Sequence, residues 1–392
     1  MLAVSTAEAT YYRYVKRLLL QQRDSADMLD IVEPTLMSEA GHCFSFVNSL
    51  ITASAGDRSI RLWVNRSAAI TINAEHVETR RYFYRRLRRL QSYFLYKKLL
   101  KRKGRLFVST AIRTDMLLLD KAAGGTIPPG KVYLYSHWFN PSASKLRSLQ
   151  KLATRQPNLV ILGPTPSIVN VFKEAGFSDA RVVPYPITPS KENKQSSSAP
   201  FRYLLYAGAA RPDKGFKQIV DLVEYLYQKK SQIPVMIQTS AEHFGKCDAA
   251  TLADIARLKE IPYAYLMLRT EVLSASEYEE MFSGAVAVQL YKATDFTDRI
   301  SGITLDAFSA GCPVITTADT WIARMVERFD AGLVVSDTSA EDVANMAKAI
   351  ISKFEAYNAN AIKAGQVLQQ ENNASMLYQV LTEATVNTDE EV

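Results

Sequence analysis

A short loop between a predicted strand and a predicted helix carries two cations and two glycines. It reads GAARPDKGF, residues 208–216. Gly208 and Gly215 allow tight turns and a close approach of a ligand to the backbone. Arg211 and Lys214 place two positive charges beside a helix N-terminus, which itself attracts anions. These features suit a diphosphate, although an ordinary strand–helix turn with solvent-facing charges has the same composition. The loop matches neither GxGxxG nor a Walker A sequence.

A second segment, DRISGITLDAFSAGCP, spans residues 298–313 and contains two carboxylates. Asp298 lies in a predicted loop, and Asp306 lies on the short helix that follows it. Ser301 is placed to cap that helix, and Gly302 leaves room for a phosphate or a sugar at its N-terminus. Because carboxylates accept hydrogen bonds from hydroxyl groups, one could hold a ribose and the other a hexose. The alternative is two surface carboxylates that flank a serine cap.

Taken together and in this order, the two segments resemble the motifs of GT-B glycosyltransferases, close to family 4. That family commonly reads G-R-x-x-x-x-K-G after a strand, then E-x7-E, then a Gly-Pro-Val strand start. Here the corresponding residues are GAARPDKG from residue 208, Asp298 with Asp306, and AGCPV from residue 310. This sequence departs from the pattern in two ways. Both glutamates are aspartates, and Ala209 occupies the position of the arginine.

The resemblance implies a fold, a reaction and a role for each motif residue. The fold would be α/β with GT-B architecture, in which two Rossmann-like domains face a cleft. Lys214 and Arg211 would stabilise a departing nucleoside diphosphate, the work that a metal ion does elsewhere. Asp306 would bind the ribose, Asp298 would bind the donor sugar, and transfer would retain the anomeric configuration. The other donor-binding residues that it implies are Gly208, Ser301, Gly302 and Ile303.

Two histidines in the N-terminal half are further candidates. His137 ends the strand-like run VYLYS and resembles the cleft histidine of the family, which contacts the donor sugar. Gly41 and His42 open a helix-like run and resemble the first loop of such enzymes, which faces the donor phosphates or the acceptor. For either histidine, the alternative is a structural residue whose hydrogen bonds are satisfied within the fold.

The elements that must position these residues alternate between short strand-like runs and helical periods. This alternation is typical of α/β domains with parallel sheets. The expected strands include 203–207, 235–238, 285–290 and 332–335. Ser274 with Glu277 and Ser339 with Asp342 are placed to cap helices. The region before Gly41 is not assigned to an element. The polar stretch 188–200 has no apolar periodicity and is interpreted as a linker. It separates an acceptor-side domain, residues 1–187, from a nucleotide-sugar domain, residues 201–357. Residues 358–392 are expected to form a helix that crosses back, followed by a tail.

Length and composition are consistent with two globular domains. The chain has 392 residues, of which 47% are hydrophobic and 22% charged, and this excludes a disordered, collagen-like or coiled-coil protein. Three cysteines form no CxxC pair and four histidines no HExxH, so we expect no metal centre and no cofactor. No apolar run approaches the length of a membrane span, and the N-terminus lacks the order of a signal peptide. We therefore expect a cytoplasmic protein.

The positive charge is concentrated in one segment. Residues 80–105 contain twelve Arg or Lys and no Asp or Glu. Since the net charge of the whole chain is +7, the rest of the chain has a net charge of −5. Phe83, Leu87, Leu90 and Phe94 are spaced to share one face of a helix. A basic amphipathic helix with aromatic residues suits an anionic membrane surface. The alternatives are a solvated helix with an apolar core face and a phosphate-binding surface for nucleic acid. The expected membrane contacts are Arg85, Arg86, Arg88 and Arg89.

We therefore predict a metal-independent, retaining hexosyltransferase. It would move a sugar from a nucleotide-sugar to a glycan or lipid-linked acceptor, in cell-surface polysaccharide or lipopolysaccharide assembly. It would be peripheral at the inner membrane face, with no nucleic acid as a partner. Two alternatives remain open: a sugar-nucleotide epimerase, which acts on the donor alone, and a non-catalytic GT-B-like binding or scaffold protein.

Overall fold

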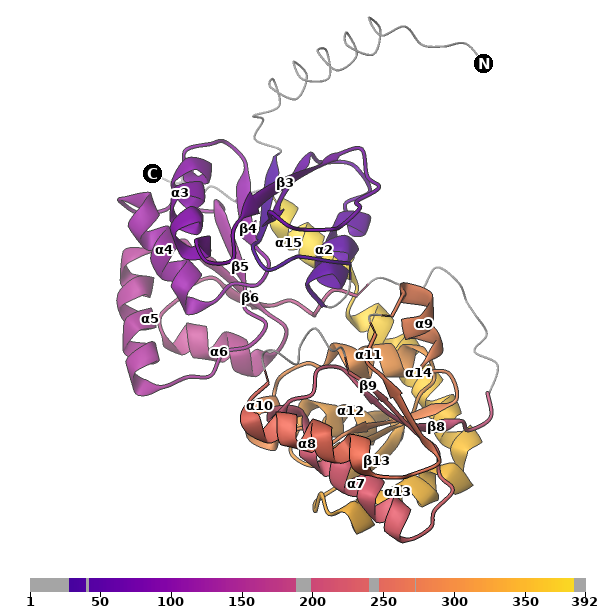
Figure 1. Ribbon diagram of the computed structural model, residues 1–392. Helices are drawn as coiled ribbons and strands as arrows, with labels where there is room; N and C mark the ends of the chain where they lie inside the picture. The colour runs from indigo at the N-terminus through magenta and orange to yellow at the C-terminus, as the bar shows by residue number, and fades with distance from the viewer. Residues whose placement is uncertain (1–27, 40–41, 188–198, 240–246, 272, 384–392) are drawn as a thin grey trace, which may run out of the picture. The chain divides into compact units, whose positions relative to one another are not determined.

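The computed structural model describes residues 28–39, 42–187, 199–239, 247–271 and 273–383 (Figure 1). The chain divides into two compact units. The first combines the residues up to 188 with those from 372 onwards, and the second comprises residues 189–371. The returning segment therefore begins at 372 and not at 358, the position expected from the sequence. Most of the expected linker, 188–198, lies outside the described residues.

Seven parallel strands form the sheet of the first unit, in the order β3-β2-β1-β4-β5-β6-β7. The strands are β1 Leu29–Glu33, β2 Ile60–Asn65, β3 Val77–Phe83, β4 Arg105–Val108, β5 Val132–Tyr135, β6 Val160–Gly163 and β7 Ala180–Val182. The helices are α2 His42–Ala53, α3 Arg88–Leu100, α4 Arg113–Ala123, α5 Ala143–Arg155, α6 Pro166–Glu174 and α15 Ala374–Thr382.

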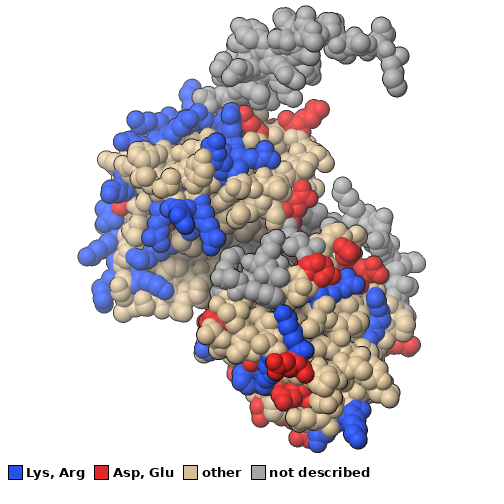
Figure 2. Space-filling model, in the orientation of Figure 1, with Lys and Arg blue, Asp and Glu red and all other residues tan. Residues whose placement is uncertain are grey.

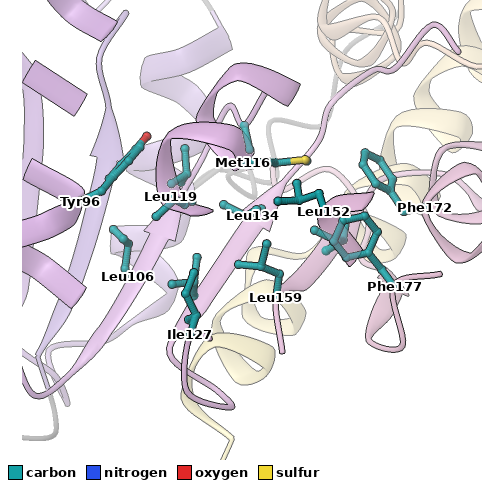
Figure 3. Packing of buried hydrophobic residues seen from close by; sticks show 14 of the residues in the cluster. Tyr96, Leu106, Met116, Leu119, Ile127, Leu134, Leu152, Leu159, Phe172 and Phe177 are labelled. Atoms are coloured by element: carbon teal, nitrogen blue, oxygen red, sulfur yellow. The ribbon is translucent and has the colours of Figure 1, made fainter. Parts of the chain in front are cut away.

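One face of this sheet is covered by helices α3 to α6, and their apolar side chains form a continuous core with the central strands (Figure 3). The core side chains labelled there are Tyr96, Leu106, Met116, Leu119, Ile127, Leu134, Leu152, Leu159, Phe172 and Phe177. The returning helix α15 packs against α2. Arg105 fixes its end by donating from Nη1 to the carbonyl oxygen of Leu381 at 2.5 Å. The C-terminal segment thus completes the first unit.

Six parallel strands form the sheet of the second unit, in the order β10-β9-β8-β11-β12-β13. The strands are β8 Tyr203–Ala207, β9 Val235–Gln238, β10 Leu266–Arg269, β11 Ala285–Gln289, β12 Val314–Thr317 and β13 Gly332–Val335. The helices are α7 Phe216–Gln228, α8 Ala249–Glu260, α9 Ala275–Glu280, α10 Ala293–Phe296, α11 Gly302–Ser309, α12 Trp321–Phe329, α13 Ala340–Ser352 and α14 Phe354–Glu371, with a 3-10 turn at Pro212–Lys214.

The strand order of the second unit reverses between β8 and β11, which are neighbours in the sheet but far apart in the sequence. In open parallel sheets, ligands bind outside the carboxyl ends of the strands at such a reversal. The loop after β8 carries Arg211 and Lys214, and the loop after β11 carries residues 290–301. Both predicted donor segments are therefore positioned at the same edge of the sheet. Among the described residues, no helix has the length and apolar character needed to cross a membrane.

Candidate functional site

The loop between β8 and α7 folds Lys214 back over an aromatic ring. Gly208, with φ +114°, follows the strand, and its N–H donates to the carbonyl oxygen of Gln238 at 3.1 Å. The 3-10 turn then brings the Lys214 Nζ to 5.5 Å from the centroid of the Tyr291 ring. A Cβ added to Gly208 would lie 3.3 Å from that Nζ. The lysine therefore lies over the carboxyl end of β8, next to the backbone at Gly208.

The Lys214 ammonium group lies in an environment that disfavours its charge. Burial lowers its pKa to about 8, and the positive charges of Arg211 and Arg299 act in the same direction. Asp213 opposes them. A desolvated cation surrounded by other cations is stabilised when an anion enters. This is the electrostatic setting that a phosphate-binding site needs.

Arg211 is held by the residue two positions further on. Its Nε donates to Asp213 Oδ1 at 2.7 Å and its Nη2 donates to Oδ2, so the guanidinium and the carboxylate are paired through two hydrogen bonds. The pair is partly exposed, with 44% of the Arg211 side chain accessible. Arg211 therefore lies at the mouth of the loop, while Lys214 lies deeper.

The N-terminus of α11 is organised as the sequence predicts. The Ser301 Oγ accepts from the N–H of Thr304 at 3.3 Å, and Gly302 has open space where a Cβ would be. The Thr304 hydroxyl donates to Gln289 Oε1 at 2.6 Å. One buried polar atom beside this helix, Gln289 Nε2, has no hydrogen-bond partner in the described part of the chain. Such an atom needs a polar ligand or ordered water.

Asp306 lies on α11, where Tyr278 of α9 donates a hydrogen bond from its hydroxyl to Oδ2 at 2.8 Å. The Asp306 residue reaches the surface, but protein surrounds its carboxyl group closely on the other sides. This desolvation raises the pKa of the carboxyl group to about 6, against the effect of the Tyr278 hydrogen bond. The group is therefore an anionic acceptor at neutral pH and a neutral one in mild acid.

Asp298 is not free to meet a sugar in this structure. Arg324, on α12, donates from Nη2 to Asp298 Oδ1 at 2.7 Å and also to the carbonyl oxygen of Thr297 at 2.7 Å. About two fifths of each side chain is exposed, 45% for Arg324 and 39% for Asp298. A sugar hydroxyl that binds Asp298 would therefore either share the carboxylate with Arg324 or displace Arg324 from it.

In the first unit, His137 is half-buried after β5 and makes a hydrogen bond to the loop after β4. Its Nε2 lies 2.7 Å from the carbonyl oxygen of Ser109, and because a carbonyl oxygen can only accept, Nε2 donates. Rings of Phe46, Tyr135 and Tyr185 lie around it, with centroids 4.9, 5.0 and 5.5 Å away. These contacts fit the structural alternative for this residue. His42 begins α2, and Gly41 lies outside the described residues.

The basic segment differs from the single amphipathic helix that its spacing predicts. Phe83 ends β3 and is buried, whereas α3 begins at Arg88. Leu87, Leu90 and Phe94 are 52%, 57% and 56% exposed, because the buried face of α3 consists of other residues. The buried residues are Ser92, Leu95, Tyr96 and Leu99. The apolar face that the solvated-helix alternative would place in the core is thus exposed at Leu87, Leu90 and Phe94.

Positive charge gathers on the first unit on the face shown in Figure 2, whereas both signs are interspersed over the second unit. Arg85, Arg86 and Arg89 are exposed and Arg88 is half-buried. Arg105 is an exception within the segment, because it binds the end of α15. In the described part of the chain, no three His, Cys, Asp or Glu side chains come together as metal ligands.

Comparison with known proteins finds no matching family model and no matching curated protein. Solved structures do match. WaaG, a glycosyltransferase involved in lipopolysaccharide biosynthesis, has a TM-score of 0.64 and 13% identity over 91% of this chain and 100% of its own. Anabaena HepE, in complex with UDP and glucose, has a TM-score of 0.61 and 14% identity over 90% and 97%. Sucrose-phosphate synthase from Thermosynechococcus elongatus has a TM-score of 0.62 and 13% identity over 91% and 96%.

The chain has the GT-B fold. The predicted α/β class and the resemblance to GT-B glycosyltransferases are confirmed by these matches and by the two parallel sheets. At identities of 13–14%, the likeness concerns the fold of the GT-B structures and not their substrates.

Four further residues of this GT-B fold lie at the predicted donor site and were not predicted from the sequence. The Tyr291 ring lies under the Lys214 ammonium, and the charge of Arg299 acts on it. Tyr278 donates a hydrogen bond to Asp306, and Arg324 donates one to Asp298. A signal for Tyr291 is present in the sequence, because it follows a predicted strand at its carboxyl end. Arg299 is next to Asp298 in the quoted motif. The partners Tyr278 and Arg324 come from other helices, and no spacing rule points to them.

Proposed function

We propose that this protein is a metal-independent glycosyltransferase that takes a hexose from a nucleoside-diphosphate sugar and retains the anomeric configuration. The observation that carries the proposal is the half-buried Lys214, desolvated beside two arginines at the strand-order reversal of the second unit. The GT-B fold supports it, as does the similar HepE structure, which is a complex with UDP and glucose. No cofactor is required, since the donor itself carries the leaving group.

The proposed chemistry places positive charge where negative charge develops. When the bond between the anomeric carbon and the diphosphate breaks, its electron pair goes to the phosphate oxygen. Lys214 and Arg211 would stabilise this leaving group, and the uncapped N–H groups at Gly302 and Ile303 would add the field of the α11 N-terminus. Asp306 would accept from the ribose hydroxyls. Asp298 would orient the transferred sugar together with Arg324.

Donor affinity is expected to be greatest between about pH 6 and about pH 8. Below the lower value Asp306 is protonated and accepts poorly from the ribose; above the upper value the free enzyme loses the Lys214 ammonium charge. Calorimetric titration of a nucleotide-sugar from about pH 5 to about pH 9 measures this, with up to about tenfold weaker binding one pH unit outside the range. Asp306→Asn should remove the acid limb only. An affinity independent of pH would contradict both assignments.

The acceptor is proposed to be a glycan or a lipid-linked saccharide at a membrane, as in polysaccharide or lipopolysaccharide assembly. Support comes from the first unit, where Leu87, Leu90 and Phe94 are exposed beside exposed arginines. Apolar side chains enter the interface of a bilayer while the arginines meet anionic headgroups. The apolar component favours lipid over nucleic acid, which would need the charges alone.

Neutralising this surface is expected to release the protein from anionic vesicles. Replacing Arg85, Arg86, Arg88 and Arg89 with glutamine should weaken binding about 100-fold or more, because each charge contributes about 1 kcal/mol at an anionic leaflet. Vesicle flotation measures this. The matched control changes four exposed lysines of the second unit to glutamine, namely Lys229, Lys230, Lys348 and Lys353. Equal flotation of both variants, or tighter binding of the wild type to RNA than to vesicles, would overturn the membrane assignment.

The proposed reaction is tested with a panel of nucleotide-sugars and a membrane extract as the acceptor source. Release of the nucleoside diphosphate from one donor, dependent on the extract, supports the transferase. Conversion of the donor sugar without the extract would indicate an epimerase. Absence of both release and nucleotide binding would favour the non-catalytic scaffold.

A further inference from the structure

Two neighbouring aromatic rings hold two cations at the edge of the second sheet. Tyr291 and Phe296 are both buried, with ring centroids 4.6 Å apart. The Lys214 Nζ lies 5.5 Å from the Tyr291 ring centroid, and the Arg299 Cζ lies 4.9 Å from the Phe296 ring centroid. A cation over an aromatic face is stabilised and loses little freedom of orientation on binding a ligand. Arg299 and Lys214 are therefore fixed by one shared support.

The two loops that carry these residues are joined by backbone contacts. The N–H of Lys292 donates to the carbonyl oxygen of Asp213 at 3.0 Å. Gly215 packs so closely on the carbonyl oxygen of Leu290 that a Cβ would collide with it. The loop after β8 and the loop after β11 are therefore in direct contact at two points. These contacts tie the loop that carries Arg299 to the loop that carries Lys214, although the two residues lie 85 positions apart in the sequence.

Positive charge exceeds negative charge at this place. Arg211 and Arg299 each act on the Lys214 ammonium, and Arg211 acts on Arg299. The carboxylates that face Arg299 are those of Asp213 and Asp295, and Asp213 is already paired with Arg211. Burial is the largest cause that lowers the pKa of Arg299. Clustering desolvated cations costs folding stability unless an anion that balances their charge binds there.

We propose that Arg299 is a further donor-binding residue, which pairs with Lys214 to grip the diphosphate of the nucleotide-sugar. This rests on the proposed function and adds a residue to it. A guanidinium offers two parallel N–H donors that match phosphate oxygens, whereas an ammonium acts as a point charge. Asp213 accepts from the Nε and Nη2 donors of Arg211. The chain also has Ala209 where the resemblance expects an arginine.

The test measures how much the second phosphate adds to nucleotide affinity, in the wild type and in variants of Arg299. Calorimetry of the full chain with UDP, GDP and ADP, and with the matching monophosphates, identifies the nucleotide that the wild type binds. Arg299→Ala is then expected to weaken the diphosphate roughly 10- to 100-fold, the loss of charge-assisted hydrogen bonds, and the monophosphate by less than about threefold. Arg299→Lys should recover part of the difference. Lys229→Ala, which removes an exposed lysine at the far end of α7, is the control and should change neither.

The outcomes separate this inference from the proposed function. If the wild type binds a diphosphate and Arg299→Ala binds it within about twofold, Arg299 is not a donor residue although the function stands. If both nucleotides weaken equally, its role is structural and the inference fails as well. If the wild type binds none of these nucleotides, the proposed function fails and the inference with it. Thermal unfolding of each variant identifies any that does not fold, in which case Arg299→Gln replaces Arg299→Ala.

Discussion

Replacing Lys214 with alanine is expected to reduce donor turnover at saturating donor by about 10²- to 10³-fold. The ammonium would contribute most when the bond to the diphosphate breaks, because negative charge is then greatest on the leaving oxygen. Its burial beside Tyr291 strengthens this effect, since electrostatic interactions are stronger where water is excluded. The loss should therefore lie in kcat more than in KM. Release of nucleoside diphosphate from the active donor measures it.

Two controls define what the Lys214 result means. Lys214→Arg keeps the charge but not its compact shape, so activity should be recovered only in part. Lys229→Ala removes a charge from the far end of α7, the helix that follows the Lys214 turn, and should leave turnover unchanged. If Lys214→Ala turned over donor within about threefold of the wild type, the lysine would not face the leaving group.

Much of the second unit could be predicted because most of its strands are buried on both faces. Tyr203–Ala207, Val235–Gln238 and Gly332–Val335 were expected as strands and are observed with the same bounds. Each is a short apolar run between turn residues, which leaves few alternatives. The expected serine caps are also present, at Ser274 with Glu277 and at Ser339 with Asp342. Local hydrogen bonding determines such caps, so local sequence suffices to find them.

The first unit was harder because charged residues lie inside its sheet. Strand β1 reads LDIVE and was not assigned from the sequence, yet all five of its residues are buried. Asp30 Oδ1 accepts from Trp63 Nε1 at 2.8 Å, and Glu33 Oε2 accepts from Ser109 Oγ at 2.8 Å. Those donors come from neighbouring strands and loops. A strand whose acids are satisfied by tertiary contacts has no periodic apolar signal of its own.

The same limit applies to the candidate site. Motif spacing identified Lys214, Arg211 and the segment 298–306, because a strand end and a helix N-terminus bring such residues together locally. The aromatic pair that supports Lys214 and the partner of Asp306 belong to other elements. Their positions follow from strand order and helix packing, which one sequence does not reveal. Gly215 is an instructive case, since the sequence suggested close approach to a ligand, whereas the structure shows close approach to Leu290.

Gly215→Ala is accordingly expected to damage both stability and donor binding. Gly215 has φ +69°, and a Cβ there would collide with the carbonyl oxygen of Leu290, a backbone atom that cannot rotate away. Left-handed strain and overpacking together predict about 2–4 kcal/mol of destabilisation. Urea denaturation measures the loss. Gly125→Ala is the control, because open space surrounds that position and its φ is not positive, so the free energy of unfolding should change by less than about 0.5 kcal/mol.

The two consequences of Gly215→Ala should be linked. To relieve the collision, the loop after β8 must separate from the loop after β11, and this would move Lys214 away from the Tyr291 ring. Donor affinity should then fall even in conditions where the variant is fully folded, by up to about the tenfold expected when the Lys214 charge is lost. If the variant were destabilised but bound the donor as the wild type does, Lys214 would not depend on the Tyr291 ring for its position. The contacts that join the loop after β8 to the loop after β11 would then contribute to the stability of the sheet edge alone.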